Sequence, residues 1–214
     1  MSQAGPESGQ GNVSNWNVPN ALTTLRIVMV PFFGWALLHD GGDSTLWRWV
    51  AWALFITAMI TDKIDGDIAR KHNLVTNFGK IADPIADKAI TGMAFIGLAV
   101  IHDFLPAWLW WTATIVVLVR EWAVTFARLS VARDVVMPAK QSGKIKTVMQ
   151  AVALGGFIAP FGHLTGALDV PGQIVWWGSA AALAVAVVLT LTSGWEFARD
   201  VMRHRRGSPA AAPR

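Results

Sequence analysis

Residues 61–88, TDKIDGDIARKHNLVTNFGKIADPIADK, place five aspartates in a chain that is otherwise strongly apolar. The whole sequence of 214 residues is 53% hydrophobic and 15% charged, and its mean hydropathy is +0.42. This composition is too apolar for an ordinary soluble domain of the same length, so the bilayer is the expected solvent. Because ionisable side chains are costly in a membrane and mark functional sites there, the acidic segment is the first candidate for chemistry.

Apolar stretches of membrane-spanning length flank the acidic segment on both sides. A spanning helix needs roughly 17 to 25 apolar residues, and no stretch has the short core of a cleaved signal peptide. The predicted fold class is an all-α integral membrane protein with one domain at residues 16–200. Six transmembrane helices are expected, the first with Asn20 as its N-cap, at about residues 20–38, 46–61, 79–101, 106–133, 143–164 and 172–199.

Both ends of the chain differ from this domain in composition. Residues 1–15 are rich in Gly, Ser and Gln without periodicity, and residues 201–214 are basic and rich in Pro and Ala. Segments of this kind do not bury an apolar face, so both tails are predicted to be disordered.

Lysine and arginine are unevenly distributed among the expected connections. They collect after the second, fourth and sixth expected helices, at Lys63, Arg70, Lys71, Lys80, Lys88, Arg128, Arg133, Lys140, Lys144, Lys146, Arg199, Arg203, Arg205, Arg206 and Arg214. The opposite side holds only Arg48. Because cytosolic connections are enriched in Lys and Arg, both termini and the acidic segment are predicted to face the cytosol. This asymmetry also explains the isoelectric point of about 9.9, so no nucleic-acid partner is predicted.

The aspartates follow helical spacing on both sides of the expected connection. Asp62 and Asp65 share one face of the first helix, and Asp83 and Asp87, four residues apart, share one face of the next. If these faces meet, four carboxylates converge and repel one another unless a cation lies among them. Since the chain has no cysteine, thiolate sites are excluded, and carboxylate oxygens are ligands that Mg²⁺ prefers.

The complete pattern resembles the signature of the CDP-alcohol phosphatidyltransferase family. It reads Asp62-x-x-Asp65-Gly66-x-x-Ala69-Arg70, then eight residues, then Gly79-x-x-x-Asp83-x-x-x-Asp87, and it matches at every fixed position. The resemblance implies a six-helix membrane enzyme, usually a homodimer, that transfers a phosphatidyl group from a CDP-linked lipid to an alcohol and releases CMP.

The same resemblance implies roles for the signature residues. The metal ligands, for two Mg²⁺ ions with Mn²⁺ as the alternative, are Asp62, Asp65, Asp83 and Asp87. Asp87 is also the implied general base. The implied contacts to CDP-diacylglycerol are at the small and basic positions, Gly66, Ala69, Arg70 and Gly79.

Three further segments, residues 17–26, 120–121 and 143–147, resemble the bacterial branch of the family that uses glycerol 3-phosphate as the acceptor. This branch implies an enzyme of the bacterial plasma membrane. In the first segment the expected donor-site residues are Asn20, Thr23 and Arg26, although capping and anchoring explain these residues equally well. In the other two, the residues expected to bind the acceptor phosphate are Arg120, Lys144 and Lys146.

Physical reasoning agrees with the assignment of Arg120. It lies about 21 Å along the helix beyond Pro106, in the cytosolic half of the expected span, where an unpaired charge is costly. A substrate phosphate would supply the partner. The alternative is a structural pairing of Arg120 with one of the signature aspartates.

The resulting hypothesis is an in-line displacement at the lipid-bearing phosphorus, with two metal ions and Asp87 as the base. Within the family, inositol phosphate, serine or phosphatidylglycerol remain alternative acceptors. Outside it, the alternatives are a divalent-cation transporter and a prenyl-pyrophosphate transferase. The one-sided placement of the acids argues against a transport path, and CMP release distinguishes the two transferases.

Overall fold

The computed structural model describes residues 17–71, 76–101, 106–131, 141–163 and 169–207, and the regular elements in these ranges are all helical. This confirms the all-α prediction. The elements in chain order are α1 (Val18–Leu38), η1 (His39–Gly42), α2 (Thr45–Lys71), α3 (Asn77–Ile101), α4 (Ala107–Val131), α5 (Gln141–Ile158), η2 (Pro160–His163) and α6 (Asp169–Gly207).

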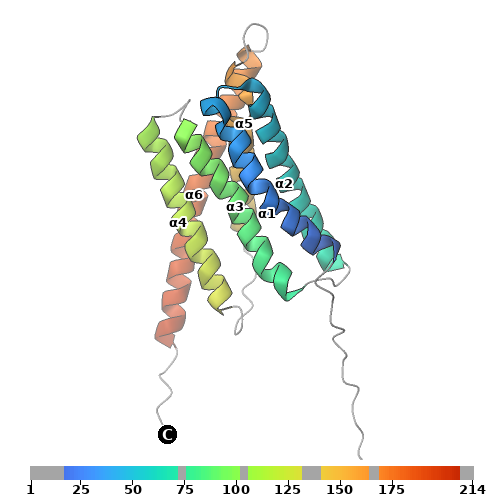
Figure 1. The fold of residues 1–214 in the computed structure, drawn as a ribbon. Helices are drawn as coiled ribbons and strands as arrows, with labels where there is room; N and C mark the ends of the chain where they lie inside the picture. The colour runs from blue at the N-terminus through green and yellow to red at the C-terminus, as the bar shows by residue number, and fades with distance from the viewer. Residues whose placement is uncertain (1–16, 72–75, 102–105, 132–140, 164–168, 208–214) are drawn as a thin grey trace, which may run out of the picture.

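The helices form a bundle whose members run alternately up and down (Figure 1). α1 packs against α2 and α3, α5 packs along α6, and α4 contacts α3 and α6. The first turns of α1 and the last turns of α6 lie at the same end of the bundle, where α2 ends and α3 begins (Figure 1). The acidic segment and both ends of the described chain therefore share one end of the molecule.

The expected tails are only partly within the described residues. Residues 1–15 lie outside the described ranges, as do residues 208–214. α6 continues to Gly207 and so extends into the range predicted as the basic tail.

The start of α1 differs from the expectation by three residues. Asn17 is the N-cap, and its side chain accepts a hydrogen bond from the backbone N–H of Asn20 at 3.0 Å. Pro19 fits the first turn because its missing N–H has no intrahelical partner there. The prediction of Asn20 as N-cap was wrong, and its side chain is consequently available for another contact.

Large apolar side chains fill the interior of the bundle. Fully buried examples from four helices are Phe33, Phe55, Phe95 and Phe157. Glycine permits a close approach of α5 to α6, since a Cβ at Gly156 would lie 1.8 Å from Ser179 Oγ of α6. Small residues at helix contacts are typical of membrane bundles.

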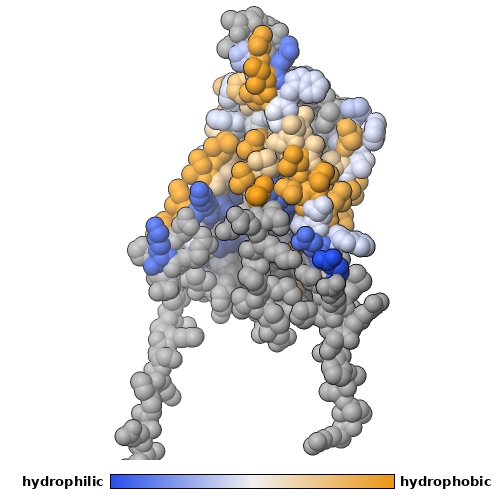
Figure 2. All heavy atoms as spheres, turned by 180° about the vertical axis from the view of Figure 1, so that it is seen from behind, coloured by the Kyte–Doolittle hydropathy of each residue, from blue (hydrophilic) through white to orange (hydrophobic). Residues whose placement is uncertain are grey.

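Large apolar side chains also cover the outer surface of the bundle. Figure 2 shows them as a broad band on one face, with hydrophilic residues below it. Large apolar side chains exposed on the bundle as a whole include Phe32, Trp35, Ile115, Val119 and Trp177. A soluble monomer rarely exposes so large a patch, whereas a membrane protein presents such a band to lipid.

Within the described ranges, length and apolar composition qualify four stretches as candidate membrane spans, at Val18–Gly42, Ile81–Ile101, Ala107–Ala127 and Val170–Glu196. α5 contributes only a shorter apolar stretch, Ile145–Ile158. α2 is not among the candidates; it carries Arg48 near its start and the acids near its end. A multi-spanning membrane protein is thus supported, and the count of six spans stays a prediction.

Arg48, the lone basic residue expected on the opposite side, has a structural role in the bundle. Its Nε donates to the carbonyl of Ile158 at 3.0 Å and its Nη2 donates to the carbonyl of Phe157 at 2.8 Å. These carbonyls are at the end of α5, where helical acceptors have no partner within the helix. Arg48 therefore caps α5 from α2.

Candidate active site

Arg26 of α1 joins the two signature aspartates of α2. Its Nη1 lies 2.6 Å from Asp62 Oδ1, and its Nη2 donates to Asp65 Oδ2. The Arg26 side chain is 0% exposed, whereas that of Asp62 is 40% exposed. The planar guanidinium suits such a two-point contact, and here its two nitrogens contact two different carboxylates.

Two other α1 residues on the same helix face contact the start of α3. Thr23 Oγ1 donates to Asp83 Oδ1 at 2.5 Å. Asn20 Nδ2 donates to Thr76 Oγ1 at 2.9 Å, and the same oxygen accepts the N–H of Gly79 at 3.0 Å. Asn20, Thr23 and Arg26 are three residues apart along α1 and so lie on one face of the helix. They contact, in turn, Thr76, Asp83 and the α2 aspartates.

Gly79 is required by this close approach. A Cβ at Gly79 would lie 3.0 Å from Asn20 Oδ1 and 3.3 Å from Thr76 Oγ1. Both oxygens take part in the hydrogen bonds between Asn20 and Thr76, so an added Cβ would press on the contact between α1 and the start of α3. The glycine of the signature thus serves helix packing as well as any ligand approach.

Electrostatics tie the four aspartates together. Partial burial raises the pKa of Asp62 to about 6, although Arg26 acts in the opposite direction. The negative charges of the other three aspartates, in order of effect Asp87, Asp65 and Asp83, add to the rise. Mutual repulsion of this kind is relieved by bound cations.

The donor chemistry of this cluster fits Mg²⁺, because it consists of carboxylate oxygens near the end of the bundle. Among the described residues, no three acidic or histidine side chains lie close enough together to surround one ion as they stand. Instead, the carboxylates of Asp62 and Asp65 contact Arg26, and that of Asp83 contacts Thr23. The cluster could therefore hold Mg²⁺ after side-chain rearrangement, for which Asp62 is accessible because its side chain is 40% exposed.

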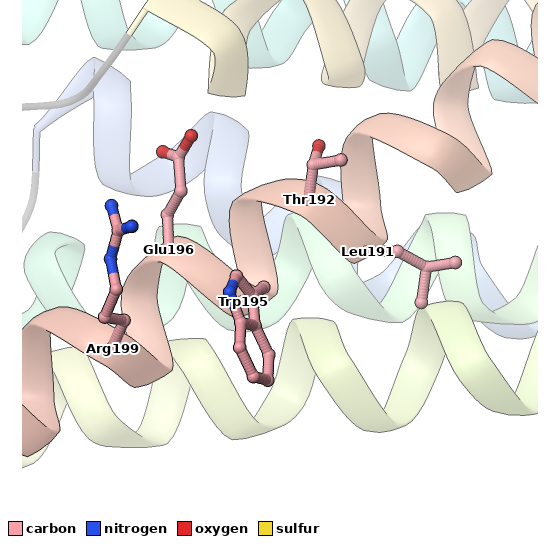
Figure 3. A pocket seen from close by; sticks show the side chains of 5 residues that line it. All are labelled: Leu191, Thr192, Trp195, Glu196 and Arg199. Atoms are coloured by element: carbon pink, nitrogen blue, oxygen red, sulfur yellow. The ribbon is translucent and has the colours of Figure 1, made fainter.

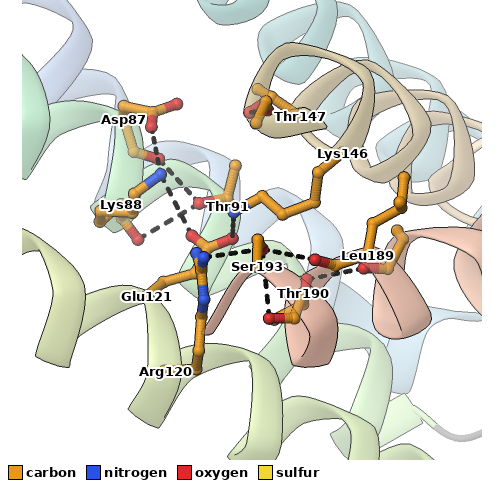
Figure 4. Close-up of polar contacts among 12 residues, drawn as sticks. Asp87, Lys88, Thr91, Arg120, Glu121, Lys146, Thr147, Leu189, Thr190 and Ser193 are labelled. Carbon is orange, nitrogen blue, oxygen red and sulfur yellow. Dashed lines mark hydrogen bonds and ion pairs between the residues drawn. The ribbon is translucent and has the colours of Figure 1, made fainter. Parts of the chain in front are cut away.

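Asp87 belongs to a second group of charges, on the side of α3 that faces α4 and α5 (Figure 4). Lys88 Nζ lies 2.6 Å from Asp87 Oδ2 and 3.1 Å from Glu121 Oε2. The other oxygen of Glu121 accepts a hydrogen bond from Lys146 Nζ at 2.8 Å. Four charges of alternating sign thus connect α3, α4 and α5.

The predicted acceptor residues are partly brought together. Arg120 Nη2 donates to Ser193 Oγ of α6 at 2.8 Å, and a Cβ at Gly194 would lie 3.1 Å from Arg120 Cγ. Lys146 points toward the same region from α5 (Figure 4). The side chain of Lys144 lies outside what the structure describes.

The remaining donor-site residues all lie in α2. Gly66 lies in α2, one residue beyond the buried Asp65. Ala69 and Arg70 also lie in α2, but their side chains are outside the described part of the chain. The roles predicted for all three residues stay predictions.

Sequence reasoning missed Lys88 and Glu121 as members of the site. Lys88 was counted only among the cytosolic positive charges. The available signal for Glu121 was its position inside an expected span, since a buried acid at that depth needs a cationic partner. The partner cations of Glu121 could not be identified from sequence spacing, because Lys88 comes from α3 and Lys146 comes from α5.

A depression on α6 is separate from these charges. Its lining residues all belong to α6 and are Leu191, Thr192, Trp195, Glu196 and Arg199 (Figure 3). It includes none of the predicted site residues.

Comparison with known proteins agrees with the signature. A family model described as CDP-alcohol phosphatidyltransferase matches residues 16–192, a range that contains all four signature aspartates and the α1 residues that contact them. The chain is 45% identical over 202 residues to the probable phosphatidylglycerophosphate synthase of Mycobacterium tuberculosis (strain H37Rv), covering 94% of this chain and 90% of that relative.

Two further relatives carry the same printed name, CDP-diacylglycerol–glycerol-3-phosphate 3-phosphatidyltransferase. The relative from Bacillus subtilis (strain 168) is 40% identical over 193 residues, covering 85% of this chain and 93% of the relative. The relative from Rickettsia felis is 36% identical over 185 residues, covering 85% of this chain and 93% of the relative.

Proposed function

Because the chain belongs to the CDP-alcohol phosphatidyltransferase family, we propose that it transfers the phosphatidyl group of CDP-diacylglycerol to glycerol 3-phosphate. The products are phosphatidylglycerophosphate and CMP. The names of the relatives support this acceptor. The observation that carries the proposal is the contact of α1 with both halves of the signature, through Arg26 to the α2 acids and through Thr23 to Asp83.

The donor is proposed to bind at the end of the bundle where α1, α2 and α3 meet. Its nucleotide would approach the small positions Gly66, Ala69 and Gly79, with Arg70 and Asn20 beside them. The burial of Arg26 and Thr23 supports a role in fixing the signature carboxylates. In this arrangement α1 orients the acids, and the acids and glycines receive the donor.

The residues proposed to hold two Mg²⁺ ions are the four signature aspartates, Asp62, Asp65, Asp83 and Asp87. When bound, such ions neutralise charge on the pyrophosphate and on the departing CMP. The mutual repulsion of the aspartates supports the assignment, since an added cation stabilises the charged carboxylates.

Asp87 is proposed to accept the proton of the attacking hydroxyl. The acceptor oxygen then forms a bond to the lipid-bearing phosphorus while the bond from that phosphorus to the CMP oxygen breaks. A carboxylate is a weak base for an alcohol, so base catalysis contributes about 10²- to 10⁴-fold. Lys88 Nζ, 2.6 Å from Asp87 Oδ2, places a cation beside the proposed base.

The acceptor phosphate is proposed to meet Arg120, Lys144 and Lys146. Arg120 and Lys146 are near enough for the charge of one to act on the other, which supports a shared anion site. Arg120 lies on α4 and Lys146 on α5. Asp87 lies on the neighbouring α3 and is linked to Lys146 through Lys88 and Glu121.

We propose that the enzyme is a homodimer in the bacterial plasma membrane, with the site facing the cytosol. The concentration of Lys and Arg on the side of the acidic segment supports this orientation. The apolar tails of the donor would stay in the bilayer, while the nucleotide and glycerol 3-phosphate would be reached from the cytosol.

A membrane assay with defined acceptors tests the proposal. CDP-diacylglycerol is supplied with glycerol 3-phosphate, inositol phosphate, serine or phosphatidylglycerol separately, and the lipid product and CMP are identified. The expected result is phosphatidylglycerophosphate and CMP with glycerol 3-phosphate alone. A lipid product formed only with another acceptor would contradict the acceptor assignment, and divalent-cation flux without CMP release would contradict the enzyme class.

A further inference from the structure

One buried carboxylate outside the family signature, that of Glu121, links three helices. Its side chain is 1% exposed. Oε1 accepts a hydrogen bond from Lys146 of α5 at 2.8 Å, and Oε2 lies 3.1 Å from Lys88 of α3. Figure 4 shows both lysines converging on this carboxylate from α3 and α5. None of the roles proposed above uses Glu121.

We propose that Glu121 is a positioning residue of the transferase reaction, which holds Lys88 against Asp87 and Lys146 beside Arg120. This inference rests on the proposed function, because it explains how the proposed base, Asp87, and the proposed phosphate-binding cations, Arg120 and Lys146, are held in place. Glu121 contacts neither substrate and acts through the two lysines.

The first argument is geometric. The ammonium group of Lys88 is shared, at 2.6 Å from Asp87 Oδ2 and 3.1 Å from Glu121 Oε2. A lysine has four rotatable side-chain bonds, and two carboxylates on opposite sides restrict it to one position. Glu121 of α4 therefore helps to fix the position of the Lys88 ammonium group next to Asp87.

The second argument is electrostatic. Along the series Asp87, Lys88, Glu121 and Lys146 the charges alternate in sign. Without the central carboxylate, the two ammonium groups would repel each other in a region where water screens poorly. Lys146 would then move toward solvent, away from Arg120, and the anion site would lose its shape.

A purely structural role, in which Glu121 only holds α3, α4 and α5 together, predicts a different result from a positioning role. If the role is purely structural, loss of Glu121 lowers thermal stability and changes the kinetic constants for both substrates alike, or for neither. Loss of a positioning residue affects the acceptor and the chemical step more than donor binding, because Lys146 and Arg120 are proposed to bind the acceptor phosphate.

The test compares Glu121→Gln, which keeps the size of the side chain and removes its charge, with the unaltered enzyme in detergent or vesicles. We expect kcat/KM for glycerol 3-phosphate to fall about 10- to 100-fold, as is typical when an orienting partner is removed. The KM for CDP-diacylglycerol should change by less than about twofold. The matched control is Thr125→Val, a nearly isosteric change at a buried position one turn further along the same face of α4, which should leave both constants unchanged.

Two more variants keep the test decisive. Glu121→Asp retains the charge but is one methylene shorter, so we expect a smaller loss of acceptor kcat/KM than in Glu121→Gln; if Glu121→Gln does not accumulate, this variant carries the comparison. Combining Glu121→Gln with Lys146→Gln should cost less than the sum of the two single effects, because both changes break the Glu121–Lys146 contact.

The outcomes separate the two claims. If the unaltered protein does not turn over glycerol 3-phosphate, the proposed function fails and this inference fails with it. If the unaltered protein is active, but Glu121→Gln matches Thr125→Val, or donor and acceptor constants change equally, or the effects in the double variant are additive, only the positioning role is overturned.

Discussion

The guanidinium of Arg26 is wholly buried and lies 2.6 Å from the carboxylate of Asp62, 36 residues further along the chain. The same group also contacts Asp65. An arginine in the third turn of the first helix therefore supplies positive charge to the acidic signature. Its removal tests how far the fold depends on that charge.

Replacing Arg26 by Ala should destabilise the protein strongly, because Asp65 would remain buried without its cation. Breaking a buried ion pair in this way costs about 3 to 5 kcal/mol. Arg26→Lys should recover only part of the loss, since an ammonium cannot make the same two-point contact. Thermal unfolding with and without Mg²⁺ gives the measurement, and Mg²⁺ should raise the midpoint of Arg26→Ala more than that of the unaltered protein. No rise in either protein would contradict Mg²⁺ binding at these carboxylates, and an equal rise in both would contradict competition between Arg26 and Mg²⁺.

Replacing Asp62 or Asp83 by Asn should abolish turnover while the protein stays folded. Each change removes a proposed metal ligand, and it also relieves repulsion among the aspartates. Activity is measured over a range of Mg²⁺ concentrations, alongside thermal stability as the control for folding. Near-normal turnover in either variant would refute the two-metal hypothesis.

Replacing Arg120 by Ala should raise the KM for glycerol 3-phosphate about 10- to 100-fold and leave the KM for CDP-diacylglycerol nearly unchanged. The reason is the loss of a charge-assisted contact with the acceptor phosphate. Arg120→Lys should recover part of the effect. If the donor constant changes while the acceptor constant does not, Arg120 belongs to the donor site or to the packing of α4 against α6 through Ser193.

Replacing Arg48 by Met should lower stability without changing either Michaelis constant. The two carbonyls at the end of α5 would lose their donors, at a cost of about 1 to 3 kcal/mol for each buried group left without a partner. This variant is the control for mutations that act only through folding. A selective effect on one substrate would show that the cap also shapes the site.

The orientation in the membrane can be tested by cysteine labelling, since the chain has no native cysteine. A cysteine introduced at Ser208 should react with a membrane-impermeant reagent only after the cells are opened. The physical reason is the excess of Lys and Arg at this end of the chain. Labelling of intact cells would reverse the proposed topology.

The sequence by itself determined the features that depend on local periodicity and composition. Hydropathy predicted the helical class, and the i, i+4 spacing predicted that Asp83 and Asp87 share a helix face. The family signature identified the acids of the site. These features depend on residues close together in the chain, so they can be read without knowing how the helices pack.

Only the tertiary structure decided which side chains contact one another. It paired Arg26 with Asp62 and Asp65, it placed Glu121 between Lys88 and Lys146, and it gave Arg48 the role of capping α5. Each contact joins different helices, and many cation–carboxylate pairings satisfy the same hydropathy pattern. The choice among them depends on the rotation and closeness of the helices, which buried side chains and glycines such as Gly79 and Gly156 set through packing.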